Sequence, residues 1–279
     1  MDKDRLSPQE IKNIEFELLK KFISFCDKYD LHYALTYGTL LGAVRHEGFI
    51  PWDDDIDVMM PREDYQKLIK ACFEKCPIEG CELLGRDNTE GYFYPFLKLC
   101  DTNTIAKMDD NHTVHGIWID IFPVDRVPDD EKKARKLHKH IRFCKNMVIS
   151  YTTNFKAKHK NWKMIPKFFY KALAKMIGIN KLVDHIENES QKFADADTHR
   201  VAIVNWQSSV GGNMDEKDFR APEKVMFNGV EMNAPRNYDG YLRSIYGDYM
   251  SMPPKSKRAA HNVDAYYKQE AKTDNEKGV

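Results

Sequence analysis

Four aspartates stand within five residues in the first quarter of the chain, at positions 53, 54, 55 and 57. Because side chains alternate along a strand, Asp55 and Asp57 are expected on one face, close together. An apolar run, residues 58–60, follows, so this strand enters a core and its carboxylates lie at the core's edge. Paired carboxylate ligands suit Mg²⁺, or Mn²⁺ in its place, with water and phosphate completing the metal shell. The pattern predicts a metal centre that acts on phosphate.

Two other interpretations of the acidic run were weighed. A solvated loop is the usual explanation of a charge run, but the apolar continuation argues against it. A calcium loop of the EF-hand type fits Asp53, Asp55 and Asp57 as its first three ligands. It fails further on, because Val58 stands where the turn glycine belongs and Asp64 where a bidentate glutamate belongs.

A glycine–threonine pair, Gly38 and Thr39, follows a predicted strand and opens a predicted short helix. Glycine at such a junction lets backbone N–H groups approach a phosphate, and the helix N-terminus adds favourable electrostatics. Such pairs are mostly helix caps, so this one gains its weight from its position, 16 residues before Asp55. A phosphate cradle, a short helix and a strand with D-x-D are typical of the nucleotidyltransferase superfamily.

The stretch GTLLGAVRHEGFIPWDDDIDVMMPREDY, residues 38–65, closely resembles the signature of the LicD family, phosphocholine transferases related to the fukutin group. The similarity resumes at GIWIDIFPVD (116–125) and at YLRSIYGDYMSMPPKSKRAAH (241–261). The resemblance implies a CDP-activated donor such as CDP-choline and an acceptor hydroxyl on a cell-surface glycan precursor, of the teichoic acid or lipopolysaccharide kind and lipid-linked. Metal-dependent transfer of phosphocholine would then release CMP.

The resemblance also assigns roles to single residues. Asp55 and Asp57 match the metal-binding pair, and Asp120 matches the third carboxylate on a later strand, where it could also accept the hydroxyl proton. In that strand Trp118, Asp120 and Phe122 are expected to share one face. Tyr37, Trp52, Trp118 and Phe122 are the aromatic residues next to the motifs that could surround a quaternary ammonium group.

The candidate phosphate contacts come partly from the family resemblance and partly from side-chain chemistry. Gly38 and Thr39 match the donor-phosphate loop of the family, and Arg45 suits phosphate because its forked guanidinium matches phosphate oxygens. Lys98 and His46 are further candidates, with His46 equally suited to a buried structural role. Lys257, Arg258 and His261 match the family's C-terminal block, in which phosphate contacts and structural contacts are not distinguished.

The elements that must position these residues follow from periodicity. A capping box at Ser7–Glu10 starts the first helix, and Asn228-Gly229 is typical of a hairpin turn. Strands are predicted at 33–37, 56–60, 82–84, 94–99, 117–122 and 201–206, with helices from Gly38 to Arg45, from Pro61 to Pro77 and within 130–196. We therefore predict an α+β fold with α/β character, a nucleotidyltransferase-like mixed sheet with flanking helices and a helical insertion. Its parts are a catalytic core (1–129), a basic helical insertion (130–200), a C-terminal part completing the catalytic domain (201–267) and a disordered tail (268–279).

Charge and composition limit the location and the partners. No run approaches the roughly 18 apolar residues of a membrane span, and no signal peptide is visible, so a cytoplasmic protein is expected. The six cysteines form no C-x-x-C unit and are expected to be reduced structural thiols. Residues 130–181 hold 15 Lys and Arg but only two acidic residues. Lys163, Lys167, Lys171 and Lys175 form a stripe that fits either a core-packed helix or a peripheral contact with the anionic inner membrane face.

Three competing functions are considered, none involving nucleic acid. A glycosyltransferase also uses D-x-D, but no Rossmann-like run precedes the motif here. A same-fold transferase that moves ribitol phosphate, glycerol phosphate, phosphoethanolamine or a nucleotidyl group is harder to exclude. A non-catalytic binding module would be favoured if a metal-face aspartate were absent, and all three are present.

Overall fold

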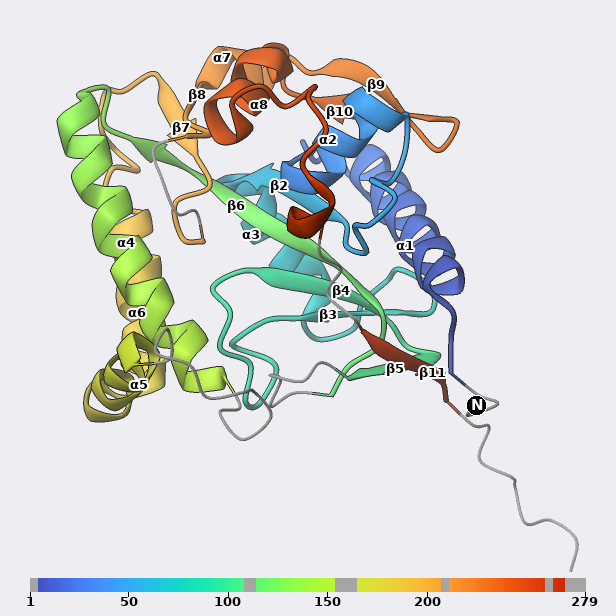
Figure 1. Cartoon of the computed structure of the whole chain (residues 1–279), viewed down its shortest axis with the longest axis horizontal. Coiled ribbons are helices and arrows are strands. Elements are labelled where there is room, and N and C mark those ends of the chain that lie inside the picture. Colours follow the sequence, from blue (N-terminus) through green and yellow to red (C-terminus); the bar gives the residue numbers. More distant parts are fainter. Residues whose placement is uncertain (1–4, 108–113, 154–164, 207–210, 259–262, 269–279) are drawn as a thin grey trace, which may run out of the picture.

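A seven-stranded mixed sheet runs through the middle of the computed structural model, which describes residues 5–107, 114–153, 165–206, 211–258 and 263–268 (Figure 1). Strands β2 and β6 are parallel neighbours, and the other strand pairs in the sheet are antiparallel. The main path across the sheet is β1 (Ala34–Leu35), β2 (Asp57–Pro61), β6 (Trp118–Val127), β4 (Leu97–Asp101) and β3 (Cys81–Leu84). Off this path, β7 (Arg200–Ala202) pairs with β6, and β8 (Met214–Asp215) pairs with β7. With its flanking helices, this sheet confirms the predicted α+β class.

Three helices flank the N-terminal half of the sheet. They are α1 (Pro8–Lys28), α2 (Tyr37–His46) and α3 (Arg62–Cys72). Helix α1 starts at the predicted capping box, in which the Ser7 hydroxyl accepts from the Glu10 N–H and the Glu10 carboxylate accepts from the Ser7 N–H. It packs against β4 and β6, and α3 packs against β2 and β6. Helix α3 therefore packs against both parallel strands that carry the aspartates, and α1 packs against one of them, β6.

Several predicted boundaries were wrong. The strand predicted at 33–37 is only two residues long. Tyr37, predicted as the last residue of that strand, is the first residue of α2. Helix α3 ends at Cys72, before the expected stop at Pro77. The strand predicted at 201–206 ends at Ala202, and residues 204–206 form a turn. Strand β4 is shifted to 97–101 from the predicted 94–99.

Helices α4 (Glu131–Thr152), α5 (Ile165–Ile177) and α6 (Ile179–Ser190) fall between β6 and β7 in the sequence and stand together at the left of Figure 1. They have an apolar cluster of their own, built around Ile141, Val148 and Ile186. Strands β6 and β7 are directly paired, so the three helices are inserted into a connection between neighbouring strands. The chain divisions predicted at 129, 200 and 267 stay predictions.

The C-terminal part returns over the first half of the chain. It contains α7 (Glu216–Arg220), β9 (Glu223–Phe227), β10 (Val230–Ala234), α8 (Tyr238–Tyr246), a 3₁₀ turn (Lys255–Lys257) and β11 (Asp264–Tyr267), which pairs with β5 (Thr104–Lys107). The predicted hairpin is confirmed: Asn228 and Gly229 both have positive φ, as its tight turn requires. The Asn228 N–H donates to Glu47 O at 2.7 Å, so the hairpin supports the end of α2.

The six cysteines are free thiols, as predicted, and five of them are buried. Among the described residues, no helix combines the length and the apolar character that crossing a membrane requires. The predicted tail beyond Lys268 lies outside the described residues.

A buried ionic group joins the inserted helices to the sheet. Arg62 donates from Nε to Asp125 Oδ1 at 2.7 Å, from Nη2 to Asp125 Oδ2 at 2.5 Å and from Nη1 to Glu187 Oε2 at 3.1 Å. Burial raises the pKa of Asp125 although Arg62 opposes that shift. Arg62 therefore compensates two carboxylates from β6 and α6.

We expect Arg62→Met to lower the free energy of unfolding by about 3–5 kcal/mol, because two carboxylates lose their buried partner. Arg135→Met is the matched control, since Arg135 pairs only with Glu131 at the surface and should change stability by less than about 1 kcal/mol. Urea unfolding of both variants measures the difference. Equal stability of the two variants would contradict a supporting role for Arg62.

Candidate active site

Three charged side chains form a row across the centre of the sheet. Asp57 on β2 and Asp120 on β6 are direct partners in the parallel pairing, and Lys98 on β4 is the antiparallel partner of Asp120. Directly paired residues project to the same face of a sheet, so the row is continuous. Lys98 Nζ lies 2.5 Å from Asp120 Oδ1, and its side chain is 4% exposed. The sheet register thus brings two predicted metal ligands and a predicted phosphate contact together.

This row lies in a cleft of about 290 Å³. Asp55 lines the cleft beside Asp57, as predicted, but not through strand alternation, because residues 53–56 precede β2 and Asp54 lines the cleft too. The alternation predicted for β6 is confirmed, because the residues on its other face, Ile119 and Ile121, are fully buried. The remaining lining residues are Tyr37, Tyr94, Phe96, Lys98, Trp118, Asp120, Phe122, Trp206 and Val263.

The electrostatics of the cleft favour a bound cation. Burial raises the pKa of Asp57 well above its usual range, and Asp55 and Asp120 raise it further. The lining holds four carboxylates and one ammonium group, that of Lys98. A divalent cation would offset most of the remaining negative charge, and carboxylates are the ligands that Mg²⁺ and Mn²⁺ take. The donor set of Asp55, Asp57 and Asp120 therefore fits such an ion.

Aromatic side chains form the rest of the cleft's lining together with Val263. Phe96 is the centre of this group, with ring centroids 4.6 Å from Phe122, 5.2 Å from Tyr94 and 5.1 Å from Trp206. Tyr37 packs edge-on against Phe122 at 5.5 Å. Sequence reasoning selected Tyr37, Trp118 and Phe122 for this role. It did not select Tyr94, Phe96 and Trp206, which lie just outside β4 and β7, where strand alternation gives no guide. The cleft thus joins an acidic end to an aromatic surface.

Two polar atoms in the cleft have no hydrogen-bond partner among the described residues, the Tyr37 hydroxyl and the Trp118 indole nitrogen Nε1. Buried donors without partners are rare in folded proteins and often belong to binding sites. Tyr37 also has a φ of 43°, a strained value for a residue with a Cβ. Tyr37 therefore combines a strained backbone with an unsatisfied buried hydroxyl.

The first turn of α2 is already in contact with the acidic loop. The Thr39 hydroxyl accepts from the Asp57 N–H at 2.7 Å and so fixes the start of β2. A Cβ added at Gly38 would collide with the Asp53 carboxylate, so Asp53 lies where the sequence predicted a phosphate. The phosphate-binding role of Gly38 and Thr39 stays a prediction, and the Asp53 carboxylate would have to make room for the phosphate.

Arg45 lies at the other end of α2, outside the residues that line the cleft. It donates from Nη1 to Tyr249 O at 2.7 Å and from Nε to His46 Nε2 at 3.0 Å. Burial and the neighbouring Arg258 lower the pKa of Arg45. Arg258 also stacks over Trp52 at 4.5 Å, so Trp52 faces this basic group and not the cleft. The side chain of Lys257, and all of His261, lie outside the described part of the chain.

Glu15 on α1 is a further carboxyl group near the aspartates that sequence reasoning missed. Its side chain is buried, and its Oε2 has no hydrogen-bond partner among the described residues. Burial raises the pKa of Glu15 well above its usual range, with Asp55 and Asp54 adding to the effect. The sequence feature that could have revealed Glu15 is its position four residues after Ile11, on the apolar face of the first helix.

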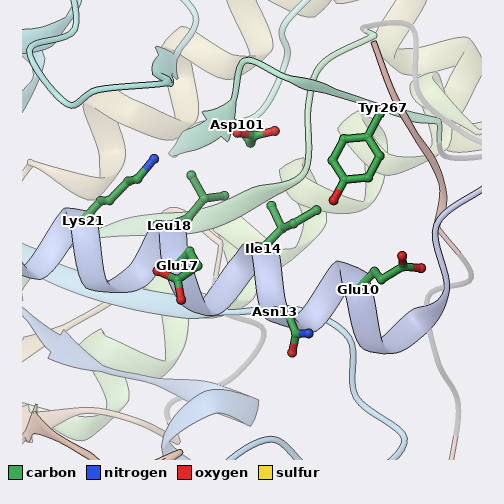
Figure 2. Close-up of a pocket in the computed structure, with 8 residues that line it drawn as sticks. All are labelled: Glu10, Asn13, Ile14, Glu17, Leu18, Lys21, Asp101 and Tyr267. Carbon is green, nitrogen blue, oxygen red and sulfur yellow. The ribbon is translucent and has the colours of Figure 1, made fainter. Parts of the chain in front are cut away.

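A separate hollow along α1 is a weaker candidate (Figure 2). Its charged groups already have partners: Glu10 caps α1, Lys21 donates to Glu79 O at 2.9 Å and Asp101 accepts from the Asn103 N–H at 3.2 Å. Figure 2 shows Asp101 and Tyr267 across from the α1 side chains, with no row of converging carboxylates. The cleft on the sheet is therefore the candidate active site.

Comparison with known proteins supports this choice. Residues 30–184 match the nucleotidyltransferase domain of the LicD/FKTN/FKRP family, a span that contains the whole charged row. The chain is 27% identical over 268 residues to the lipopolysaccharide cholinephosphotransferase LicD of Haemophilus influenzae, covering 94% of this chain and 98% of the relative. A shorter segment of 49 residues is 45% identical to an uncharacterised protein of Rickettsia prowazekii and covers 18% of each chain.

Proposed function

Because this chain belongs to the LicD/FKTN/FKRP nucleotidyltransferase family, we propose that it is a phosphotransferase that moves phosphocholine from CDP-choline to a glycan hydroxyl. The Haemophilus relative, a lipopolysaccharide cholinephosphotransferase by name, supports a lipopolysaccharide-type acceptor. CMP would be the leaving group. The acceptor would be a lipid-linked precursor of a cell-surface glycan. The enzyme would be cytoplasmic and would bind this precursor at the inner membrane face.

The observation that carries this proposal is the meeting of carboxylates and aromatic rings in one cleft. A donor that carries a phosphate next to a quaternary ammonium needs both surfaces, a metal-binding end for the phosphates and ring faces for the cation. The distance between the two ends is short, because Trp118 and Asp120 are two residues apart on one strand face. Phosphocholine has this same succession of groups.

The chemistry assigns different work to the residues of the row. Asp55, Asp57 and Asp120 would hold Mg²⁺ or Mn²⁺, which supplies charge neutralisation at the diphosphate. Asp120 is partly exposed, so an acceptor hydroxyl can reach it and pass its proton to the carboxylate. Lys98 already sits against Asp120 and can turn its ammonium group toward a phosphate oxygen. The Tyr37 hydroxyl and the Trp118 indole N–H are donors for the remaining oxygens. Arg45 would contact an anionic group at the far end of α2, outside the cleft.

A panel of donors tests the proposal. The purified chain is incubated with Mg²⁺, a lipopolysaccharide acceptor and, separately, CDP-choline, CDP-ethanolamine, CDP-ribitol or CDP-glycerol, and CMP release is measured. The proposal expects CDP-choline to give the highest kcat/KM. Faster turnover of CDP-ethanolamine, CDP-ribitol or CDP-glycerol would reassign the donor.

Trp206 provides a residue-level test of choline recognition. We expect Trp206→Leu to raise the KM for CDP-choline by about 2- to 30-fold, the range that loss of one cation–π contact allows. The KM for CDP-ethanolamine should change less, because a primary ammonium group is held chiefly by hydrogen bonds. Trp206→Phe retains a ring face and should lie between wild type and the leucine variant. Equal effects on both donors would remove Trp206 from head-group recognition.

We also propose that α5 contacts an anionic membrane surface. Its Phe168, Phe169 and Met176 are each more than half exposed, so this edge is not core-packed. Lys175 is exposed beside them, and Lys171 donates to Thr153 O at 3.0 Å. Large exposed apolar side chains next to lysines are typical of a helix that lies in a membrane interface. Lys163, the first residue of the predicted stripe, lies outside the described residues.

Vesicle sedimentation at low salt tests this contact. Binding to anionic vesicles should be abolished when glutamate replaces Lys163, Lys167, Lys171 and Lys175, since each lysine contributes about 1 kcal/mol near such a surface. Turnover on a soluble acceptor mimic should be kept. The matched control carries Glu at four exposed lysines elsewhere, Lys28, Lys70, Lys75 and Lys217. Equal loss in both variants would mean that net charge alone drives binding, and no loss would return α5 to a structural role.

A further inference from the structure

Three side chains that ligate transition metals meet between two of the inserted helices. His140 and Cys144 are one turn apart on α4, and His185 faces them from α6. Their nearest ligand atoms all lie within 4.8 Å of one another. His140 Nε2 is 2.7 Å from His185 Nε2 and 4.0 Å from Cys144 Sγ. None of these residues belongs to the strands that carry the carboxylate row, so this is a separate group.

The separations are close to those of a tetrahedral metal site. With Zn–N near 2.0–2.1 Å and Zn–S near 2.3 Å, neighbouring ligand atoms stand about 3.3–3.6 Å apart. The two observed separations, 2.7 Å and 4.0 Å, lie on either side of that range. Both histidines are exposed at the surface, so small rotations of their rings are enough to reach it. Helix packing has therefore placed the ligand atoms close to the required positions.

The surroundings can supply the fourth ligand. A hollow lined by both histidines also contains Glu189, one turn after His185 on α6. Lys192 Nζ holds the Glu189 carboxylate at 3.2 Å, which keeps it at the mouth of the hollow. Water or this carboxylate can complete four-coordination.

We propose that His140, Cys144 and His185 bind Zn²⁺ and thereby link α4 to α6. Thiolate and imidazole are the ligands that structural zinc sites use, and a site formed from two helices joins them only in the folded chain. Binding breaks the hydrogen bond between the two histidines and the S–H bond of Cys144. The Cys144 sulfur then forms a bond to the metal and its proton passes to solvent. The site does not depend on the proposed transferase reaction.

Zinc binding is measured on tag-free, chelator-treated protein by competition with a chromophoric chelator. Wild type should bind one zinc ion per chain, and zinc should raise its melting temperature. His140→Gln and His185→Gln should each weaken binding by at least about 100-fold, since even outer-shell changes cost 10- to 100-fold. Both positions are exposed, so these variants should fold. With Co²⁺ in place of zinc, a thiolate-to-cobalt absorption band should appear and be lost in Cys144→Ala.

Two controls separate this site from other zinc-binding positions. His199→Gln removes an exposed histidine outside the group and should bind as wild type does. Asp57→Asn alters the carboxylate row and should also leave this zinc affinity unchanged. Wild type that binds no zinc, or wild-type affinity in both His140→Gln and His185→Gln, would overturn the proposal and leave a hydrogen-bonded histidine pair.

Discussion

Exchange of Asp57 for asparagine is expected to lower turnover on the order of 1,000-fold while the chain still folds. Asparagine keeps the shape and the Asp57 N–H still donates to Thr39, but the negative charge that would hold the metal is gone. The loss should appear in kcat for CMP release. Asp55→Asn should behave in the same way, because Asp55 is the other carboxylate of the predicted metal pair.

The same variant should change stability in a way that depends on the metal. Without Mg²⁺, Asp57→Asn should melt at the same or a slightly higher temperature, because a buried carboxylate facing Asp55 and Asp120 is no longer ionised. With Mg²⁺, the melting temperature should rise in wild type and much less in the variant. Asp101→Asn is a matched control, since Asp101 is 8% exposed, as Asp57 is, and lies outside the cleft. Near-normal kcat in Asp57→Asn under limiting Mg²⁺ would contradict the metal assignment.

Exchange of Asp120 for asparagine is expected to reduce activity to a comparable degree and, unlike Asp57→Asn, to destabilise the fold. Lys98 is buried and loses the charge that compensates it, which costs about 3–5 kcal/mol when one partner of a buried pair is removed. Activity and melting temperature must therefore be measured on the same preparations. The loss of kcat should persist when it is expressed per folded molecule.

A double variant separates the two roles of Asp120. Lys98→Met with Asp120→Asn removes both charges and should recover most of the stability, because neither partner of the buried pair is left without the other. Its activity should stay low, since the carboxylate that completes the metal site is still absent. Recovery of activity together with stability would show that Asp120 serves only to compensate Lys98.

The sequence predicted the acidic part of the site better than the aromatic part. The alternation around Asp120 follows from strand geometry, which is local, whereas Asp55 lines the cleft beside Asp57 from a position before β2. The direct pairing of Asp57 with Asp120 depends on sheet register, and that is set by packing over the whole core. Trp206 and Tyr94 reach the cleft from segments far apart in the chain, so no periodic pattern could reveal them.

Other differences have equally physical causes. Lys98 was predicted to contact phosphate, but sequence does not show that its nearest acceptor is Asp120 on the neighbouring strand. Arg45 shares a helix with Gly38, yet seven residues of helix span about 10 Å and place it outside the cleft. His140 and His185 stand 45 residues apart in sequence, and only the packing of α4 on α6 brings them together.

The most direct test of the proposed reaction follows the phosphorus atom of CDP-choline that carries choline. The donor is labelled at that phosphorus and incubated with the enzyme, Mg²⁺ and lipopolysaccharide that lacks phosphocholine. We expect the label to enter the lipopolysaccharide together with choline and CMP to be released unlabelled, at a rate that falls sharply in Asp57→Asn. Labelled free phosphocholine, with the CMP group attached to the acceptor, would contradict it and identify a nucleotidyltransferase instead.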